Sequence, residues 1–73
     1  MAKNIRLRVL RAERTWSQRR VSQRARISFN RYWRIEAGEA APTPEERRRI
    51  ARAFGVSPDE AFPVSGLNQE REA

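Results

Sequence analysis

Residues 17–38 read SQRRVSQRARISFNRYWRIEAG and contain two short segments of the same design, each beginning with a serine. Ser17 and Ser28 are suited to cap helices, because a serine oxygen accepts a hydrogen bond from a free backbone N–H group of the first turn. An apolar residue precedes each serine and another follows four positions later, a spacing typical of a hydrophobic staple. The stretch therefore predicts two short helices, and Arg26-Ile27 leave room only for a tight turn that holds them at a steep angle.

Capping signals on both sides of this pair predict three more helices. Asn4 is placed to cap a first helix that buries Leu7 and Leu10 and ends at Thr15 and Trp16. Residues 43–46 and 57–60 form two capping boxes with proline at the first helical position; the fourth helix is expected to end at Phe54 before a glycine, and the fifth near Phe62 before a proline. We expect an all-α, compact five-helix domain over residues 1–62 with a helix-turn-helix formed by its second and third helices, and a flexible C-terminal tail over residues 63–73.

The basic charge is concentrated in the first half of the chain. The formal net charge is +7, and residues 1–34 carry 11 basic side chains against a single acid, Glu13. A coding bias would explain why 15 of the 16 basic residues are arginine, but it would not explain why they are segregated. A basic surface of this kind attracts polyanions, which indicates a nucleic acid as the partner.

Several function classes are disfavoured by what the sequence lacks. It has no histidine and no cysteine, so we expect no metal site, no disulfide and no cofactor. It has no glycine-rich phosphate loop and no carboxylate pair in an apolar setting, so an enzyme is not expected. No apolar run reaches membrane-spanning length, which indicates a soluble cytoplasmic protein. A core this small supplies about 3–5 kcal/mol of stability, which favours self-association.

The second and third predicted helices lack acidic residues in their first turns, where the helix dipole favours a negative charge. Residues 18–20 are Gln-Arg-Arg and residues 29–31 are Phe-Asn-Arg. DNA phosphate would satisfy both the free N–H groups and the dipole. The alternative is that surface arginine is simply tolerated at these positions.

An ordered set of short motifs resembles the Cro and lambda-repressor-like helix-turn-helix family, of the xenobiotic-response-element type. The resemblance covers about residues 5–62 and is carried by Leu10-Arg11, Ser17-Gln18, Ile27-Ser28, Ile35-Glu36 with Gly38, Pro42, Ile50-Ala51 and Gly55-Val56-Ser57. It implies a transcriptional regulator, most often a repressor, that binds double-stranded DNA sequence-specifically as a homodimer. Residues 28–37 would then enter the major groove.

The resemblance also implies roles for individual side chains. Helical geometry agrees, because positions 29, 30, 33, 34 and 37 share one face while 32, 35 and 36 lie opposite. Asparagine can pair with adenine, arginine with guanine, and phenylalanine can press on a thymine methyl group. The expected base contacts are Phe29, Asn30, Trp33 and Arg34; the expected phosphate contacts are Gln18, Arg19, Arg20, Arg26 and Arg31; and Arg11 and Glu36 are expected to form a structural ion pair.

The sequence departs from the family pattern in a few places. Ser22 and Arg26 stand where the family usually has alanine and glycine. Arg47 replaces a usual core leucine, which predicts a smaller core or a register shift in the fourth helix. Residues 39–41 lack the basic side chains that some relatives use in this loop.

Two large aromatic residues four positions apart, Phe29 and Trp33, leave an alternative function open. Exposed together they would form an apolar patch, and such patches often mark protein interfaces. In this reading the protein is an adaptor or is antitoxin-like, and it binds a protein partner through these residues or through the tail. A further alternative is that Trp33 completes the core. For a homodimer, the candidate contacts are Phe62, Val64 and Leu67.

Overall fold

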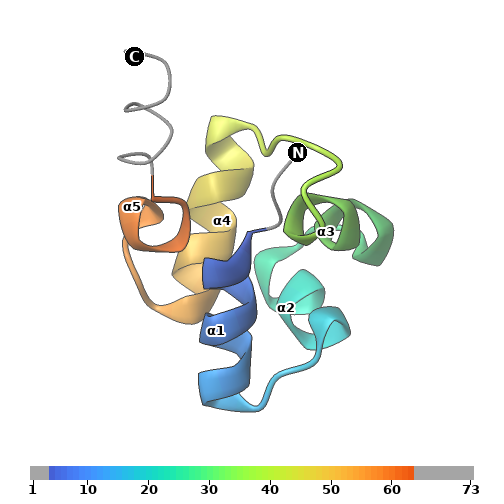
Figure 1. Cartoon of the computed structure of the whole chain (residues 1–73). Helices are drawn as coiled ribbons and strands as arrows, with labels where there is room; N and C mark the ends of the chain where they lie inside the picture. Colours follow the sequence, from blue (N-terminus) through green and yellow to red (C-terminus); the bar gives the residue numbers. More distant parts are fainter. Residues whose placement is uncertain (1–3, 64–73) are drawn as a thin grey trace.

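The computed structural model describes residues 4–63, and every regular element in this range is an α-helix. The helices are α1 (Ile5–Arg14), α2 (Gln18–Ala25), α3 (Phe29–Glu36), α4 (Pro44–Phe54) and α5 (Pro58–Ala61). Figure 1 shows α4 in the middle of the molecule, with α5 on one side of it and α3 at the opposite edge. The prediction of a compact all-α domain with five helices is confirmed.

Each helix begins at the residue that the sequence predicted. The side chain at every N-cap accepts a hydrogen bond from a backbone N–H group of the first turn, and α4 and α5 both have complete capping boxes. Three helices end on a residue with left-handed backbone: Thr15 at φ 54°, Arg26 at φ 60° and Gly55 at φ 77°. Only Gly55 adopts this conformation without strain from a Cβ atom.

All five elements contribute side chains to one core. The buried face of α1 supplies Leu7 and Leu10, and Trp16 in the following loop stacks on Phe54 of α4, with ring centroids 5.7 Å apart. The remaining buried hydrophobic residues are Val21, Ala25, Tyr32, Ile35, Ile50, Ala51, Ala61 and Phe62. Because α2 packs against both α3 and α4, the core fixes the orientation of the helix pair.

The departures from the family pattern are accommodated locally. The hydroxyl group of Ser22 is buried and donates to the carbonyl oxygen of Arg19 at 2.7 Å, so the serine fits between the helices. In α4 the buried residues are Ile50, Ala51 and Phe54, so this helix keeps the expected register. Arg47 is partly buried on the same side, and its Nε atom is buried without a hydrogen-bond partner.

Of the expectations about the C-terminal region, the structure contradicts one and does not reach the others. Phe62 is 9% exposed and packs into the core, so its proposal as a dimer contact is wrong. Val64 and Leu67, like nearly all of the expected tail, lie outside the described residues. Within residues 4–63, no helix combines the length and apolar character required to cross a membrane.

Candidate nucleic-acid interface

Helix α3 has one face in the core and the other in solvent. Tyr32, Ile35 and Glu36 are buried, as helical geometry predicted. On the opposite face Asn30, Trp33 and Arg34 are exposed, and Phe29 is half-buried. Figure 1 shows α3 at the edge of the molecule, so these side chains are available to a large partner.

The buried carboxylate of Glu36 ties α3 to the rest of the fold. It is 3% exposed and accepts hydrogen bonds from Arg11 Nε at 2.8 Å, Arg11 Nη2 at 3.0 Å, Gln18 Nε2 at 2.7 Å and the hydroxyl group of Tyr32 at 2.8 Å. Two parallel bonds to one guanidinium group form a fork that fixes orientation as well as distance. The donors come from α1, α2 and α3, so this carboxylate holds the angle at which α3 is presented.

The ionisation of these groups follows from their contacts. Burial on its own raises the pKa of Glu36, but the hydrogen bonds from Arg11, Gln18 and Tyr32 outweigh it, and the pKa lies below its usual value of 4.5. The pKa of Tyr32 is raised by burial and by the neighbouring charge of Glu36. At neutral pH the structure therefore contains an ionised Glu36 and a neutral Tyr32, whose hydroxyl group donates a hydrogen bond to the carboxylate.

Gln18 lies at the first position of α2, where the resemblance places a phosphate contact. In the structure its amide nitrogen is bound to Glu36 Oε1. The start of α2 is thereby connected to the end of α3. Contact between Gln18 and phosphate stays a prediction, for which the amide still has a second N–H group besides the one that donates to Glu36.

Positive charge and free helix N-termini occur together beside α3. The first turns of α2 and α3 contain no acidic residue. Arg19 and Arg20 are exposed in the first turn of α2, and Arg26 is exposed at the C-cap of α2, two residues before the Ser28 cap of α3. The guanidinium group of Arg19 does not project freely, because its central carbon lies 4.7 Å from the centre of the Phe29 ring.

Arg31 differs from the other expected phosphate contacts because it already has a carboxylate partner. Its Nε and Nη2 atoms donate to the two oxygens of Glu46 at 2.9 Å each, and Nη2 also donates to the carbonyl oxygen of Ala41. The hydrogen bond to Glu46 raises the pKa of Arg31, and the same contact lowers the pKa of Glu46. Arg31 connects α3 to the start of α4 in the free protein and is less available to phosphate than Arg19 or Arg20.

The two aromatic residues of α3 have different surroundings. Trp33 is 42% exposed, so the alternative in which it completes the core is wrong. Phe29 is half-covered by the side chain of Arg19. The two rings therefore do not form one uniform apolar patch, because a charged group lies on one of them.

Sequence reasoning missed two sets of contacts, one between α3 and α4 and one around Trp16 at the edge of the core. Glu46 was recognised only as part of a capping box, yet it also binds Arg31. Trp16 carries the guanidinium groups of Arg14 and Arg24 over its ring, at 5.8 Å and 4.7 Å. Nothing in the linear sequence indicates these contacts, because each depends on how separate elements pack.

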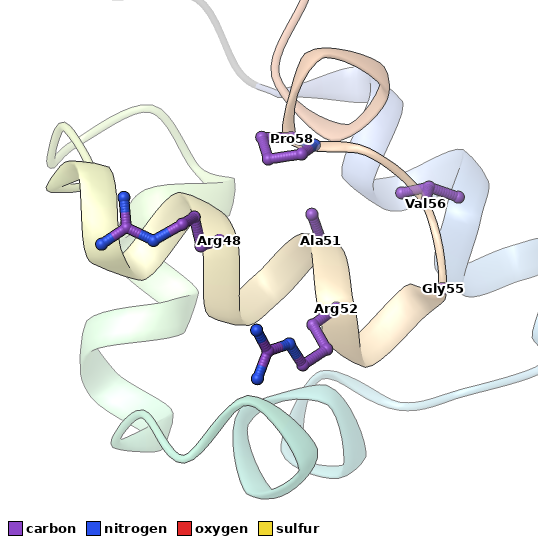
Figure 2. A pocket seen from close by; sticks show the side chains of 6 residues that line it. All are labelled: Arg48, Ala51, Arg52, Gly55, Val56 and Pro58. Atoms are coloured by element: carbon purple, nitrogen blue, oxygen red, sulfur yellow. The ribbon is translucent and has the colours of Figure 1, made fainter.

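A shallow pocket of about 380 Å³ lies on the other side of α4, beside α5. Arg48, Ala51 and Arg52 line it from α4, and Val56 and Pro58 close it from the following loop and α5. Figure 2 shows both guanidinium groups pointing away from Pro58 and Val56. The lining contains no carboxylate and no nucleophile, so the pocket does not have the groups that acid–base or covalent catalysis requires.

The described helices thus place the tightly connected pair α2 and α3 at one edge of the fold. The outer face of α3 is in solvent, and exposed arginines lie on α2 and in the turn before α3. This arrangement is a helix-turn-helix. Residues 5–62 match the model of the family described as helix-turn-helix domain, and the chain belongs to this family. No match was found among the curated proteins or among the solved structures. Helix-turn-helix domains are DNA-binding rather than enzymatic domains, so family membership indicates DNA binding and a role in transcription regulation.

Proposed function

We propose that this protein is a sequence-specific transcriptional regulator, and specifically a repressor, that inserts residues 28–37 into the major groove of double-stranded DNA. The observation that carries the proposal is the division of α3 into a buried face held by Glu36 and an exposed face bearing Asn30, Trp33 and Arg34. A rigidly oriented helix at the edge of a basic fold is suited to reading base edges.

The exposed side chains have the chemistry for direct readout. Asn30 can form a bidentate pair with adenine and Arg34 with guanine, each worth about 1–3 kcal/mol of discrimination. Trp33 offers an apolar surface to a thymine methyl group or to a sugar. Phe29 is the first residue of the same helix, and the guanidinium group of Arg19 lies over its ring.

Contacts with the DNA backbone would supply most of the sequence-independent affinity. Arg19 and Arg20 are exposed in the first turn of α2, and Arg26 is exposed in the turn before α3. Neutralising a phosphate releases a condensed counterion, so each such contact makes binding more sensitive to salt. The first turns of α2 and α3 contain no acidic residue, so the positive ends of both helix dipoles also favour binding of a phosphate group.

We further propose that the regulator acts as a homodimer on a pseudo-palindromic operator with half-sites about one helical turn, roughly 34 Å, apart. Support comes from the outer face of α1, where Ile5 is 66% and Val9 is 38% exposed. These two residues lie four positions apart and so share one face of the helix. A second copy of the chain could cover this exposed apolar pair in a dimer.

Selection of bound sequences from a random duplex pool tests the proposal, with the affinity of the selected duplex then measured against salt concentration. A two-fold symmetric consensus bound well above the pool would support a dimeric regulator. Binding with a steep salt dependence but no consensus would refute sequence-specific readout.

Matched variants separate the two kinds of contact. Asn30→Ala should relax the preference at one base position, whereas Arg20→Ala should weaken binding to all sequences alike and flatten the salt slope by about one unit. Arg52→Ala is the control, because it removes the same charge from the pocket beside α5 instead of from α2 or α3. Equal effects of all three variants would refute the assigned roles.

The exposure of Trp33 also favours a second candidate function, in which the domain is an adaptor or is antitoxin-like and binds a protein through this side chain. The two functions differ in the effect of Trp33→Ala. A regulator should lose affinity for the selected duplex, whereas an adaptor should keep its DNA affinity and lose a protein that co-purifies with it.

A further inference from the structure

The contact between Arg19 and Phe29 joins the two helices of the DNA-binding motif on their solvent side. Arg19 is the second residue of α2 and Phe29 is the first residue of α3, and the guanidinium carbon lies 4.7 Å from the ring centre. At this distance the guanidinium group is attracted to the electron-rich face of the ring. Within residues 4–63 the structure gives Arg19 no ion pair, so the ring is the group that orients its charge.

The contact also limits what Phe29 can do. A thymine methyl group would have to pack against an aromatic face, and a guanidinium group occupies one face of this ring in the free protein. The side chain of Phe29 is half-buried, whereas Trp33 one turn later is clearly exposed. Arg19 therefore excludes a base from one of the two faces of a ring that is already half-buried.

We propose that Phe29 is a positioning residue that holds Arg19 for a backbone phosphate, and that it does not read a base itself. The proposal rests on the proposed DNA-binding function and changes the role assigned to one residue within it. The ring restricts the long arginine side chain to a region beside the N-termini of α2 and α3, where a phosphate also meets free N–H groups. Orienting the side chain before DNA binds reduces the conformational entropy lost on binding.

Arg20 provides an internal comparison. It is the next residue of α2 and is also exposed, but it has no aromatic ring beneath it among the described residues. Both arginines should contribute to the salt dependence of binding. Only the contribution of Arg19 should depend on residue 29.

A double-mutant cycle on the duplex obtained by selection tests this coupling, using Arg19→Ala, Phe29→Leu and the double variant. Phe29→Leu should weaken binding about two- to five-fold, the fold-change that corresponds to an exposed cation–π contact. It should have no further effect once Arg19 is alanine. Phe29→Tyr should restore most of the affinity, because its ring has the same attraction for a guanidinium group.

Replacing each thymine of the duplex with uracil removes its methyl group and tests the opposing role. The effect of Phe29→Leu should be the same on every uracil-substituted duplex as on the original. If the effect disappears when one particular thymine is replaced, or if it adds fully to the effect of Arg19→Ala, Phe29 reads a base and the proposal is overturned. Urea unfolding of each variant shows whether loss of affinity comes from loss of folded protein.

Failure of the proposed function is distinguishable from failure of this proposal. If selection yields no consensus, sequence-specific readout is refuted, and the same cycle is then measured on a random duplex at low salt. Coupling between residues 19 and 29 on that duplex supports the positioning role. Independent effects, or no measurable DNA binding by the wild-type protein, overturn it.

Discussion

Replacement of Glu36 by glutamine should cost this domain most of its stability, although the two side chains have nearly the same shape. The carboxylate is 3% exposed and receives four hydrogen bonds, two of them from Arg11. A glutamine presents an NH₂ group to one pair of these donors whichever way its amide is turned. If that group faces the Tyr32 side, the hydroxyl group can rotate and accept, but Arg11 Nε then meets a second donor.

The expected magnitude follows from what remains after the substitution. Removing one partner of a buried ion pair costs about 3–5 kcal/mol, because the other charge is left without compensation. The side chain of Arg11 is 20% exposed and keeps a hydrogen bond to the carbonyl oxygen of Trp16, which places the cost at about 3 kcal/mol. A core of this size supplies about 3–5 kcal/mol, so Glu36→Gln should be barely folded at room temperature.

Urea unfolding followed by circular dichroism measures this loss. Tyr32→Phe removes a single donor to the ionised Glu36 and should cost about 1.5–2 kcal/mol, which gives a less destabilised variant on the same scale. Glu45→Gln is the control, because the ion pair between Glu45 and Arg49 is largely exposed and its loss should cost less than about 1 kcal/mol. A Glu36→Gln variant as stable as the control would refute the argument that this carboxylate holds the helices together.

The pH dependence gives an independent test of the same group. The pKa of Glu36 is lower in the folded protein than its usual value of 4.5, so its contribution to stability is complete above about pH 4.5. That contribution is lost as the pH falls from 4.5 through the lower folded pKa. The difference in unfolding free energy between wild type and Glu36→Gln should therefore shrink on acidification, and a constant difference down to pH 2 would contradict the assignment.

Three further substitutions test the local geometry, each by its change in urea-unfolding free energy. Arg26→Gly should stabilise the protein by about 0.5–1 kcal/mol, because Arg26 has φ 60° and glycine adopts this backbone without strain; destabilisation would contradict this. Gly55→Ala should cost about 1 kcal/mol from backbone strain alone, since nothing lies within 4 Å of the added Cβ atom, and no change would show that α4 tolerates another ending. Ser28→Ala should cost about 1 kcal/mol through loss of the hydrogen bond to Arg31 N, and a neutral result would show that the cap of α3 is dispensable.

The helices could be predicted from the sequence because their signals are local. A capping side chain bonds to a backbone group only three residues away, so Ser17, Ser28 and Thr43 have the same effect in almost any context that permits a helix. Helical periodicity likewise separated the buried from the exposed positions of α3 before any partner was known. The order of the capping residues and apolar repeats along the chain was sufficient to predict the fold class.

The contacts at the candidate interface could not be predicted in the same way. Arg31 binds Glu46, 15 residues later, although the resemblance assigned this arginine to phosphate. Arg19 lies on the ring of Phe29 ten residues away, and Gln18 binds Glu36 at the far end of α3. A long flexible side chain has many possible partners in sequence, and only the packing angle between helices brings one of them within reach.

The sequence by itself thus determined five helices, their boundaries, the all-α fold and a basic helix pair with one face of α3 in solvent. Backbone hydrogen bonds within a turn and the 3.6-residue repeat act over short distances, so they are encoded in short stretches of the chain. Only the tertiary structure decided which arginines are already paired, that Trp33 is exposed, and that Glu36 collects donors from three helices. These features depend on distances between elements, which the buried core determines and no single segment encodes.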